Sequence, residues 1–354
     1  MSVAAHTPVQ CGIVPPQLLV RVARQGDPRF AGAAAAARDS LLCDEAFRDT
    51  RRAAPVQHLD QGLHRPGAAP RSVWNARGSE LLPGIQARTE GTPPTPDAAV
   101  NEVYDGLGSA RVLLWNAFHR DSLDDHGMPL RATVHFASHY DNAVWDGSRF
   151  VFGDGDGQVF ARFTRSLSAL GHEFGHALVQ QTADLDYLGQ SGALHESLAD
   201  VFGSLVDQYA HGHSAAQATW LIGEGLFIDE LDAHAIRSLK APGTAYNDDV
   251  LGKDPQPSSM ADYVETDDDN GGVHLNSGIP NRAFFLVATW LGGNAWEAPG
   301  QIWYNTLTAG TLAPCVDFTG FARATTRTAS SMFGEGSTEH TAVAAAWREV
   351  GVVA

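Results

Sequence analysis

The feature that most constrains this chain is a pair of histidines four residues apart, His172 and His176, with Glu173 directly after the first. Residues four apart lie on one face of a helix, so both imidazoles can reach one metal ion. After nineteen further residues, Glu196 lies in a second stretch whose apolar residues have helical spacing. The pattern predicts two antiparallel helices that bring a third ligand to the histidine pair.

Two imidazoles and one carboxylate leave a fourth position open on a tetrahedral zinc ion, as in catalytic rather than structural sites. Asp200, one helical turn after Glu196, can hold the second nitrogen of a ligand histidine. A bare histidine motif can arise by chance, but the added acids make coincidence the weaker interpretation. One catalytic Zn²⁺ would generate a hydroxide-like nucleophile, and Glu173 could pass the water proton to a leaving amine.

Composition excludes several partners. The formal net charge of -17 argues against nucleic acid and anionic membranes. No run of eighteen apolar residues occurs, so we expect no membrane span. Three cysteines, an odd count, imply no disulfide framework. The first ten residues do not resemble a secretory signal, which predicts a cytoplasmic precursor or export by a non-standard route.

The pattern along the chain predicts an α+β fold with a β-rich amino-terminal lobe and a helical carboxy-terminal lobe, joined by the metal-binding helix. Substrate would bind in the cleft between the lobes. We expect a helix at 97–120, strands at 132–140 and from 149, and helices at 215–229, 278–292, 299–309, 317–333 and 338–350. The predicted divisions are a front segment at 1–52, a linker or processing region at 53–71, and lobes at 72–190 and 191–354.

The front segment is mildly basic and contains Pro15-Pro16 and an alanine run. A docked arm on the acidic body and a disordered tail are both consistent with this composition. In the amino-terminal lobe, Asp154 and Asp156 could bind calcium, but Asp-Gly pairs more often form a tight turn, which we favour.

Five motifs, in order, resemble the thermolysin family of zinc metallopeptidases over about 73–353. They are Asn142-Ala-Val-Trp145, Gly153-Asp-Gly-Asp-Gly-Gln158, His172-Glu-Phe-Gly-His176, Gly192-Ala-Leu-His-Glu-Ser-Leu-Ala-Asp200, and Asp269-Asn-Gly-Gly-Val-His-Leu-Asn-Ser-Gly278. The front segment resembles the short prosegment of the protealysin branch. The resemblance implies a two-lobed thermolysin-like fold and a neutral endopeptidase, made as a self-processing precursor, that cleaves polypeptides before bulky apolar residues.

The resemblance also implies a role for each matching residue. The zinc ligands would be His172, His176 and Glu196, with Asp200 behind a ligand histidine. The catalytic groups would be the general base Glu173, the oxyanion donors Tyr187 and His274, and Asp269, which would orient His274. The substrate-binding groups would be Asn142, the backbone of Ala143, Arg237, and an apolar pocket of Phe160, Phe163, Ala169 and Ile236, for which ordinary core packing stays equally open.

Some positions depart from the family pattern. Ser168 stands where calcium-rich members carry a carboxylate, so we expect few or no calcium ions. His195, where the family usually has Asn, has no explanation from sequence. Because an active peptidase endangers its own cell, we interpret the front segment as an attached inhibitor. Cys11 could bind the zinc as a thiolate, but packing as a small apolar residue is the favoured interpretation.

Two other functions remain to be separated from this one. An aminopeptidase usually has a Gly-x-Met-x-Asn signature and eighteen residues before the ligand Glu, and this chain has neither. A binding module that keeps the fold without turnover would be expected to have lost Glu173 or His274, and both are present.

Overall fold

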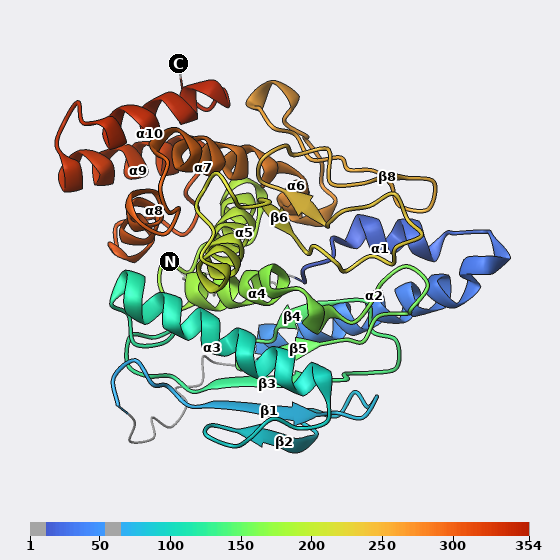
Figure 1. Cartoon of the computed structure of the whole chain (residues 1–354). Helices are drawn as coiled ribbons and strands as arrows, with labels where there is room; N and C mark the ends of the chain where they lie inside the picture. The colour runs from blue at the N-terminus through green and yellow to red at the C-terminus, as the bar shows by residue number, and fades with distance from the viewer. Residues whose placement is uncertain (1–11, 54–64, 354) are drawn as a thin grey trace.

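The computed structural model describes residues 12–53 and 65–353, with side chains described for 12–47 and 65–353. The chain forms two lobes with helix α4 (Leu167–Gln180) between them (Figure 1). The two-lobed α+β prediction is confirmed. Within the described residues, none of the helices combines the length and apolar character needed to cross a bilayer.

A five-stranded mixed sheet forms the amino-terminal lobe. Its order is β2 (Ile85–Thr89), β1 (Arg71–Asn75), β3 (Leu130–Val134), β5 (Phe150–Phe152) and β4 (Ala143–Trp145). The three central strands are parallel, and the two edge strands pair antiparallel. Helix α3 (Ala98–Phe118), as predicted, packs against β1 and β3 (Figure 1). Strand β4 is therefore an edge, available for a further strand.

The strand predicted at 132–140 is wrong beyond Val134. His135, Ala137 and His139 have φ of 54°, 51° and 59°, values that extended backbone cannot contain. The alternation of apolar residues there instead reflects a tight, half-buried loop. His135 lies in that loop between two carboxylates, with Nδ1 2.8 Å from Asp154 and Nε2 3.0 Å from Asp97.

The helical lobe contains α5 (Gly189–His211), α6 (Asp269–Asn276), α7 (Gly278–Leu291), α8 (Ala298–Thr308), α9 (Phe318–Phe333) and α10 (Thr338–Glu349). Helices α7 to α10 lie within about one residue of their predicted positions. The helix predicted at 215–229 is wrong. That stretch holds the short strand β6 (Leu221–Ile222), paired with β7 (Arg237–Ser238), and positive φ at Trp220, Gly223 and Gly225 prevents a helix.

The front segment packs on the body of the protein. Helix α1 (Pro16–Ala23) lies beside the hairpin of β8 (Asn247–Asp248) and β9 (Gly252–Lys253), while α2 (Ala31–Ala53) lies beside β4 (Figure 1). Arg21 Nε donates to the Val250 carbonyl at 3.2 Å. For the described part of the front segment, the docked arm therefore prevails over the disordered tail.

Glycines allow α4 and α5 to approach closely. A Cβ at Gly175 would lie 2.6 Å from the Ala199 Cα, and one at Gly203 would lie 2.6 Å from the Ser168 carbonyl oxygen. Both distances are shorter than van der Waals contact, so neither position can carry a side chain without moving a helix. This contact brings the two halves of the histidine and glutamate motif together.

We expect Gly175→Ala to destabilise the protein by about 2 kcal/mol, because the added methyl group must push backbone aside. Helix propensity alone would predict a gain of about 1 kcal/mol, so the sign distinguishes the two effects. Urea unfolding measures it. Gly26→Ala is the control, since a Cβ there meets nothing within 4 Å. Equal stability of both variants would contradict the close-packing argument.

Candidate metal centre and active site

The predicted histidine pair lies on one face of α4. His172 and His176 are buried, and their Nε2 atoms are 2.9 Å apart. Together with Glu173 they form a group whose possible ligand atoms all lie within 4.8 Å of one another. The helical geometry expected from the four-residue spacing is confirmed.

Glu196 reaches the same point from α5. Its Oε1 lies 3.4 Å from the His176 Nε2, and its Oε2 lies 3.8 Å from the His172 Nε2. Among the described residues, no donor supplies a hydrogen bond to this buried Oε2. A buried carboxylate facing two close imidazole nitrogens is costly unless a cation joins them. The donor set, two nitrogens and one oxygen, fits a zinc ion with one position left open.

Asp200 fixes the first histidine from behind. Its Oδ1 is 2.7 Å from the His172 Nδ1, and Arg237 donates to both carboxylate oxygens at 2.8 and 2.9 Å. Asn281 adds a third donor at 2.8 Å. Burial would raise the pKa of Asp200, but the Arg237 and His172 charges hold it below its ordinary range. The carboxylate is therefore ionised and orients the His172 ring.

Tyr187 and His274 lie beside Glu196. The Tyr187 hydroxyl donates to Glu196 Oε1 and is 3.4 Å from the His274 Nε2. Asp269 accepts from the His274 backbone at 2.9 Å and lies 2.7 Å from its Nδ1. Burial opposes the charged imidazole, but the Asp269 and Glu196 carboxylates raise the pKa of His274 to about 9. His274 thus carries a proton at neutral pH.

The edge strand holds Glu173. Its Oε2 accepts the Trp145 backbone N–H at 2.7 Å, and the Trp145 indole donates to Gln180 on α4 at 2.6 Å. Sequence reasoning assigned no role to Trp145 or Asn281, because their contacts join elements far apart in the chain. His195 now has a position: its ring packs edge-on against His176 and Tyr187, with centroids 5.0 and 5.5 Å away.

The front segment crosses the site as an extended peptide. Gly12 pairs antiparallel with Val144, and the Ile13 N–H donates to the Ala143 carbonyl at 3.1 Å. Three side chains contact its backbone: Asn142 accepts the Val14 N–H at 3.0 Å, Arg237 donates to the Ile13 carbonyl at 2.9 Å, and the His274 Nε2 lies 3.3 Å from the Gly12 carbonyl.

The predicted pocket residues have a different environment. Phe160, Phe163, Ala169 and Ile236 are buried, and the Phe160 ring packs on Phe163 and Phe227 with centroids 5.7 and 5.3 Å away. Their role in substrate preference stays a prediction. Cys11 lies outside the described residues, and so does the zinc–thiolate contact considered for it.

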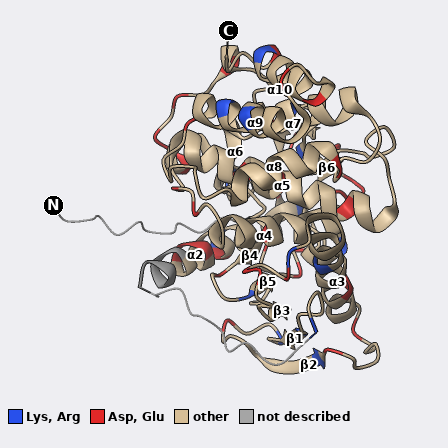
Figure 2. Cartoon of the chain, turned by 90° about the vertical axis from the view of Figure 1, so that its left-hand side faces the viewer, with Lys and Arg blue, Asp and Glu red and all other residues tan. Residues whose placement is uncertain are grey.

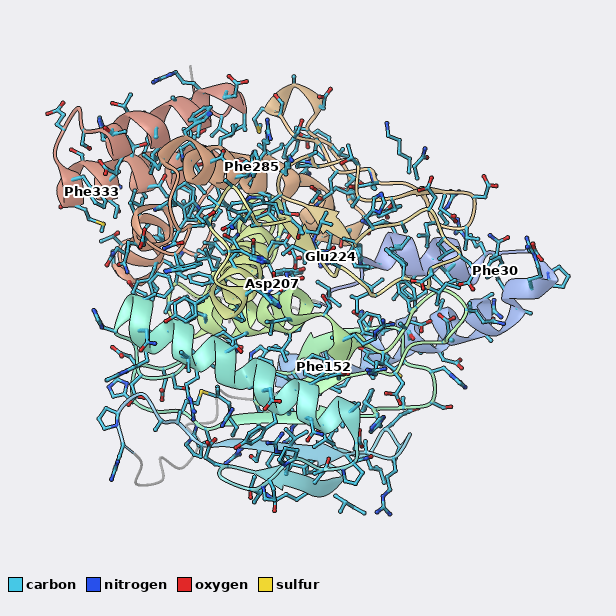
Figure 3. All side chains as sticks on the ribbon, in the orientation of Figure 1. Phe30, Phe152, Asp207, Glu224, Phe285 and Phe333 are labelled. Atoms are coloured by element: carbon cyan, nitrogen blue, oxygen red, sulfur yellow. The ribbon has the colours of Figure 1, made fainter. Side chains whose placement is uncertain are left out.

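The acids considered for calcium binding lie in two places. Asp156 accepts the Gln158 and Val159 backbone N–H groups at 2.6 and 2.7 Å, which is the tight turn that we favoured. Asp207, on α5, and Glu224, after β6, lie on neighbouring segments (Figure 3). Burial, with a contribution from Glu224, raises the pKa of Asp207. The expectation of few or no calcium ions stays a prediction.

Comparison with known proteins gives consistent matches. The family model described as thermolysin metallopeptidase, catalytic domain, matches residues 93–180, and the one described as thermolysin metallopeptidase, alpha-helical domain, matches 183–352. An extracellular metalloprotease of Pectobacterium carotovorum subsp. carotovorum is 45% identical over 342 residues, covering 97% of this chain and 96% of the relative. Protease PrtS of Photorhabdus sp. (strain Az29) is 47% identical over 80% of this chain and 76% of its own.

A solved structure is similar along the same length. It is titled the precursor of protealysin, a metalloproteinase from Serratia proteamaculans, and superposes with a TM-score of 0.88 at 45% identity. The match covers 97% of this chain and 100% of that one.

We expect Asp200→Asn to weaken zinc binding by roughly 10- to 100-fold, because the neutral amide no longer fixes the His172 ring or strengthens it as a ligand. Competition against a chelator measures the affinity at a temperature where the variant is folded. Asp207→Asn, on the same helix, should bind zinc as the wild type does. An unchanged affinity in Asp200→Asn would show that His172 is oriented by other contacts.

Proposed function

The chain belongs to the thermolysin family of metallopeptidases, and from that premise we propose that it is a zinc-dependent neutral endopeptidase made as a precursor whose front segment blocks its own cleft. The observation that carries the proposal is the extended backbone of Gly12, Ile13 and Val14. It engages the edge strand, Asn142, Arg237 and His274 as a bound polypeptide would.

Zinc would be held by His172, His176 and Glu196, where it supplies Lewis-acid activation of water and of the peptide carbonyl. Glu173, positioned by the Trp145 N–H, would take a proton from the attacking water and deliver it to the leaving amine. Strand β4 pairs with the front segment through Val144 and binds Glu173 through Trp145, so it would place a substrate strand beside Glu173.

Charge that develops on the carbonyl oxygen needs donors. Tyr187 and the protonated His274 would each stabilise it by roughly 2–4 kcal/mol, and the Asp269 carboxylate keeps His274 charged at neutral pH. Arg237 and Asn142 would hold the residues after the scissile bond through their backbone. Such backbone contacts accept many sequences, as a general endopeptidase requires.

The register of the front segment on β4 supports the predicted preference for a bulky apolar residue directly after the scissile bond. The Gly12 carbonyl lies near His274, so the Gly12–Ile13 bond takes the place of a scissile bond and Ile13 that of the residue after it. Ile13 is apolar and fully buried there. A bulky apolar side chain at this position in a substrate would gain the same burial, worth about 2 kcal/mol.

Two relatives are named extracellular, which supports export of this protein before it acts on polypeptides. Retention of an inhibitory front segment until export would protect the cell that makes it.

We expect wild-type precursor to lose its front segment and then cut a protein substrate, both sensitive to a zinc chelator. Glu173→Ala should stay intact and inert, since it lacks the proton acceptor. Mass spectrometry and gel analysis follow both reactions. Glu224→Ala, a carboxylate outside the site, is the control and should behave as wild type.

The same assay separates the alternatives. A substrate with blocked amino termini is cut internally only by an endopeptidase, so its survival would favour an aminopeptidase. Bound zinc with no hydrolysis after removal of the front segment would favour a binding module.

We expect Ile13→Asp to open the cleft, because a buried carboxylate at this position is poorly solvated. The precursor should then cleave a short peptide at least about tenfold faster than wild type before any loss of mass. Leu42→Asp, at an exposed apolar residue of the same segment, is the control. Equal initial rates for all three proteins would contradict a blocking role for the front segment.

A further inference from the structure

The mechanism does not use one buried acid, Asp141, which immediately precedes the substrate-binding Asn142. Its side chain is completely buried, and within the described chain no donor forms a proper hydrogen bond to either carboxylate oxygen. The nearest groups are the side chain and backbone N–H of Asp156, in the turn after β5. An ionised carboxylate in this position would be desolvated next to a second carboxylate.

Asp156 is the acid of the two that accepts backbone hydrogen bonds. Its Oδ1 accepts the N–H groups of Gln158 and Val159 at 2.6 and 2.7 Å, and its Oδ2 accepts that of Phe160 at 3.3 Å. Backbone donors stabilise a carboxylate, and Asp141 has only the Asp156 N–H near its side chain. The pair is therefore satisfied when Asp141 carries a proton and shares it with Asp156.

Helix α2 of the front segment packs against the chain at Asp141 and on both sides of it. The Ser40 hydroxyl accepts the Asp141 backbone N–H at 2.8 Å. Two residues beside Asp141 bind Asp44 of the same helix: the Tyr140 hydroxyl at 2.5 Å and the Asn142 amide at 2.9 Å. Docking thus adds the acidic residue Asp44 next to two acids already present, and α2 is marked by acidic residues in Figure 2.

The turn that carries Asp156 also contacts α2. Gln158 accepts the Ala33 backbone N–H at 2.8 Å and donates to the Arg29 carbonyl at 3.0 Å, so it caps the start of the helix. The segments that carry Asp141 and Asp156 are therefore both hydrogen-bonded to the front segment. A change in the protonation of the pair would alter the contacts that hold α2.

We propose that docking of α2 requires a proton on the Asp141–Asp156 pair, so that the front segment is held tightly at acidic pH and loosens as the pH rises. The inference deepens the proposed function, because it rests on the front segment acting as a releasable inhibitor. One proton is taken up from solvent when α2 docks and returned to solvent when α2 leaves.

The direction of the pH dependence follows from the way docking changes the pKa of Asp141. Burial, with the charge of Asp156 and a smaller contribution from Asp44, raises the pKa of Asp141 from 3.8 to about 10 while α2 is docked. Release of α2 would remove Asp44 and uncover the segment from Tyr140 to Asn142, which α2 contacts, so the pKa of Asp141 would fall. The docked state binds the proton more tightly, and docking is therefore strongest at low pH and weakens between these two values.

The other titratable groups around the pair do not reverse this pH dependence. Burial raises the pKa of the Tyr140 hydroxyl well above its ordinary value and that of the Cys43 thiol to about 11, so both stay neutral across the range. His135, in the loop before Tyr140, pairs with Asp154 and Asp97 rather than with Asp141. The charged groups that act on Asp141 are thus two acids.

Hydrogen exchange of the full-length Glu173→Ala precursor tests the proposal, because this inactive protein should keep its front segment. Opening of α2 is followed from about pH 5 to about pH 9, corrected for intrinsic exchange, with α9 as the internal reference. We expect the opening constant of α2 to rise with pH, by up to about tenfold per pH unit. Asp141→Asn in the same protein should make it independent of pH, since an amide can donate to Asp156 without a titrating proton.

Two further variants make the result decisive. Asp156→Asn removes the second carboxylate and gives Asp141 an amide donor, so it too should flatten the dependence, and it serves if Asp141→Asn does not fold. Asp154→Asn, an acid in the same turn paired with His135, should leave the dependence intact. A pH-independent α2 in the parent protein, or an undiminished slope in the folded Asp141→Asn or Asp156→Asn variant, would overturn the proposal.

The outcome is separate from that of the proposed function, because exchange is measured on an inactive variant. If the α2 opening constant did not change with pH while the wild type showed chelator-sensitive hydrolysis, only the proposed proton linkage would be contradicted. A proton-linked slope without any hydrolysis would leave the linkage and remove the peptidase.

Discussion

The contact between α4 and α5 is the constraint on which the rest of the structure depends. Glycines at the crossing let the two backbones approach until His172 and His176 face Glu196 across a few ångströms. A single added methyl group at Gly175 would separate them. The ion pair of Asp200 with Arg237 then fixes the geometry from the far side, because a buried aspartate with three donors has little freedom to move.

The edge strand β4 has two roles at once. Its Trp145 N–H orients Glu173, while Ala143 and Val144 pair with an incoming extended chain. An antiparallel strand pair sets the height of every residue along it, so the peptide is placed against the proton acceptor by the same hydrogen bonds that bind it. In the proposed mechanism, the same strand would therefore bind the substrate and align it with the Glu173 carboxylate.

Arg237 connects the metal side of the site to the peptide side. Two of its nitrogens bind Asp200, and a third binds the carbonyl of Ile13. The front segment uses this arrangement through its backbone and adds a second attachment through α2. In the proposed precursor, inhibition would thus combine a substrate-like backbone contact in the cleft with a helix docked outside it, so release could be controlled away from the reacting groups.

The sequence by itself determined the parts of this protein that depend on short spacings. The four-residue interval placed two imidazoles on one helical face, and ordered motifs led to the family. Tertiary structure alone decided the rest, because long-range contacts have no period in the chain. The residues after Val134 alternate between apolar and polar as a strand does, but positive φ at three of them ends the strand there. The segment at 215–229 has helical spacing of apolar residues, but positive φ at Trp220 and two glycines prevents a helix. Likewise, Asn281, Trp145 and the Asp141–Asp156 pair acquire their partners only when segments far apart in sequence pack together and exclude water.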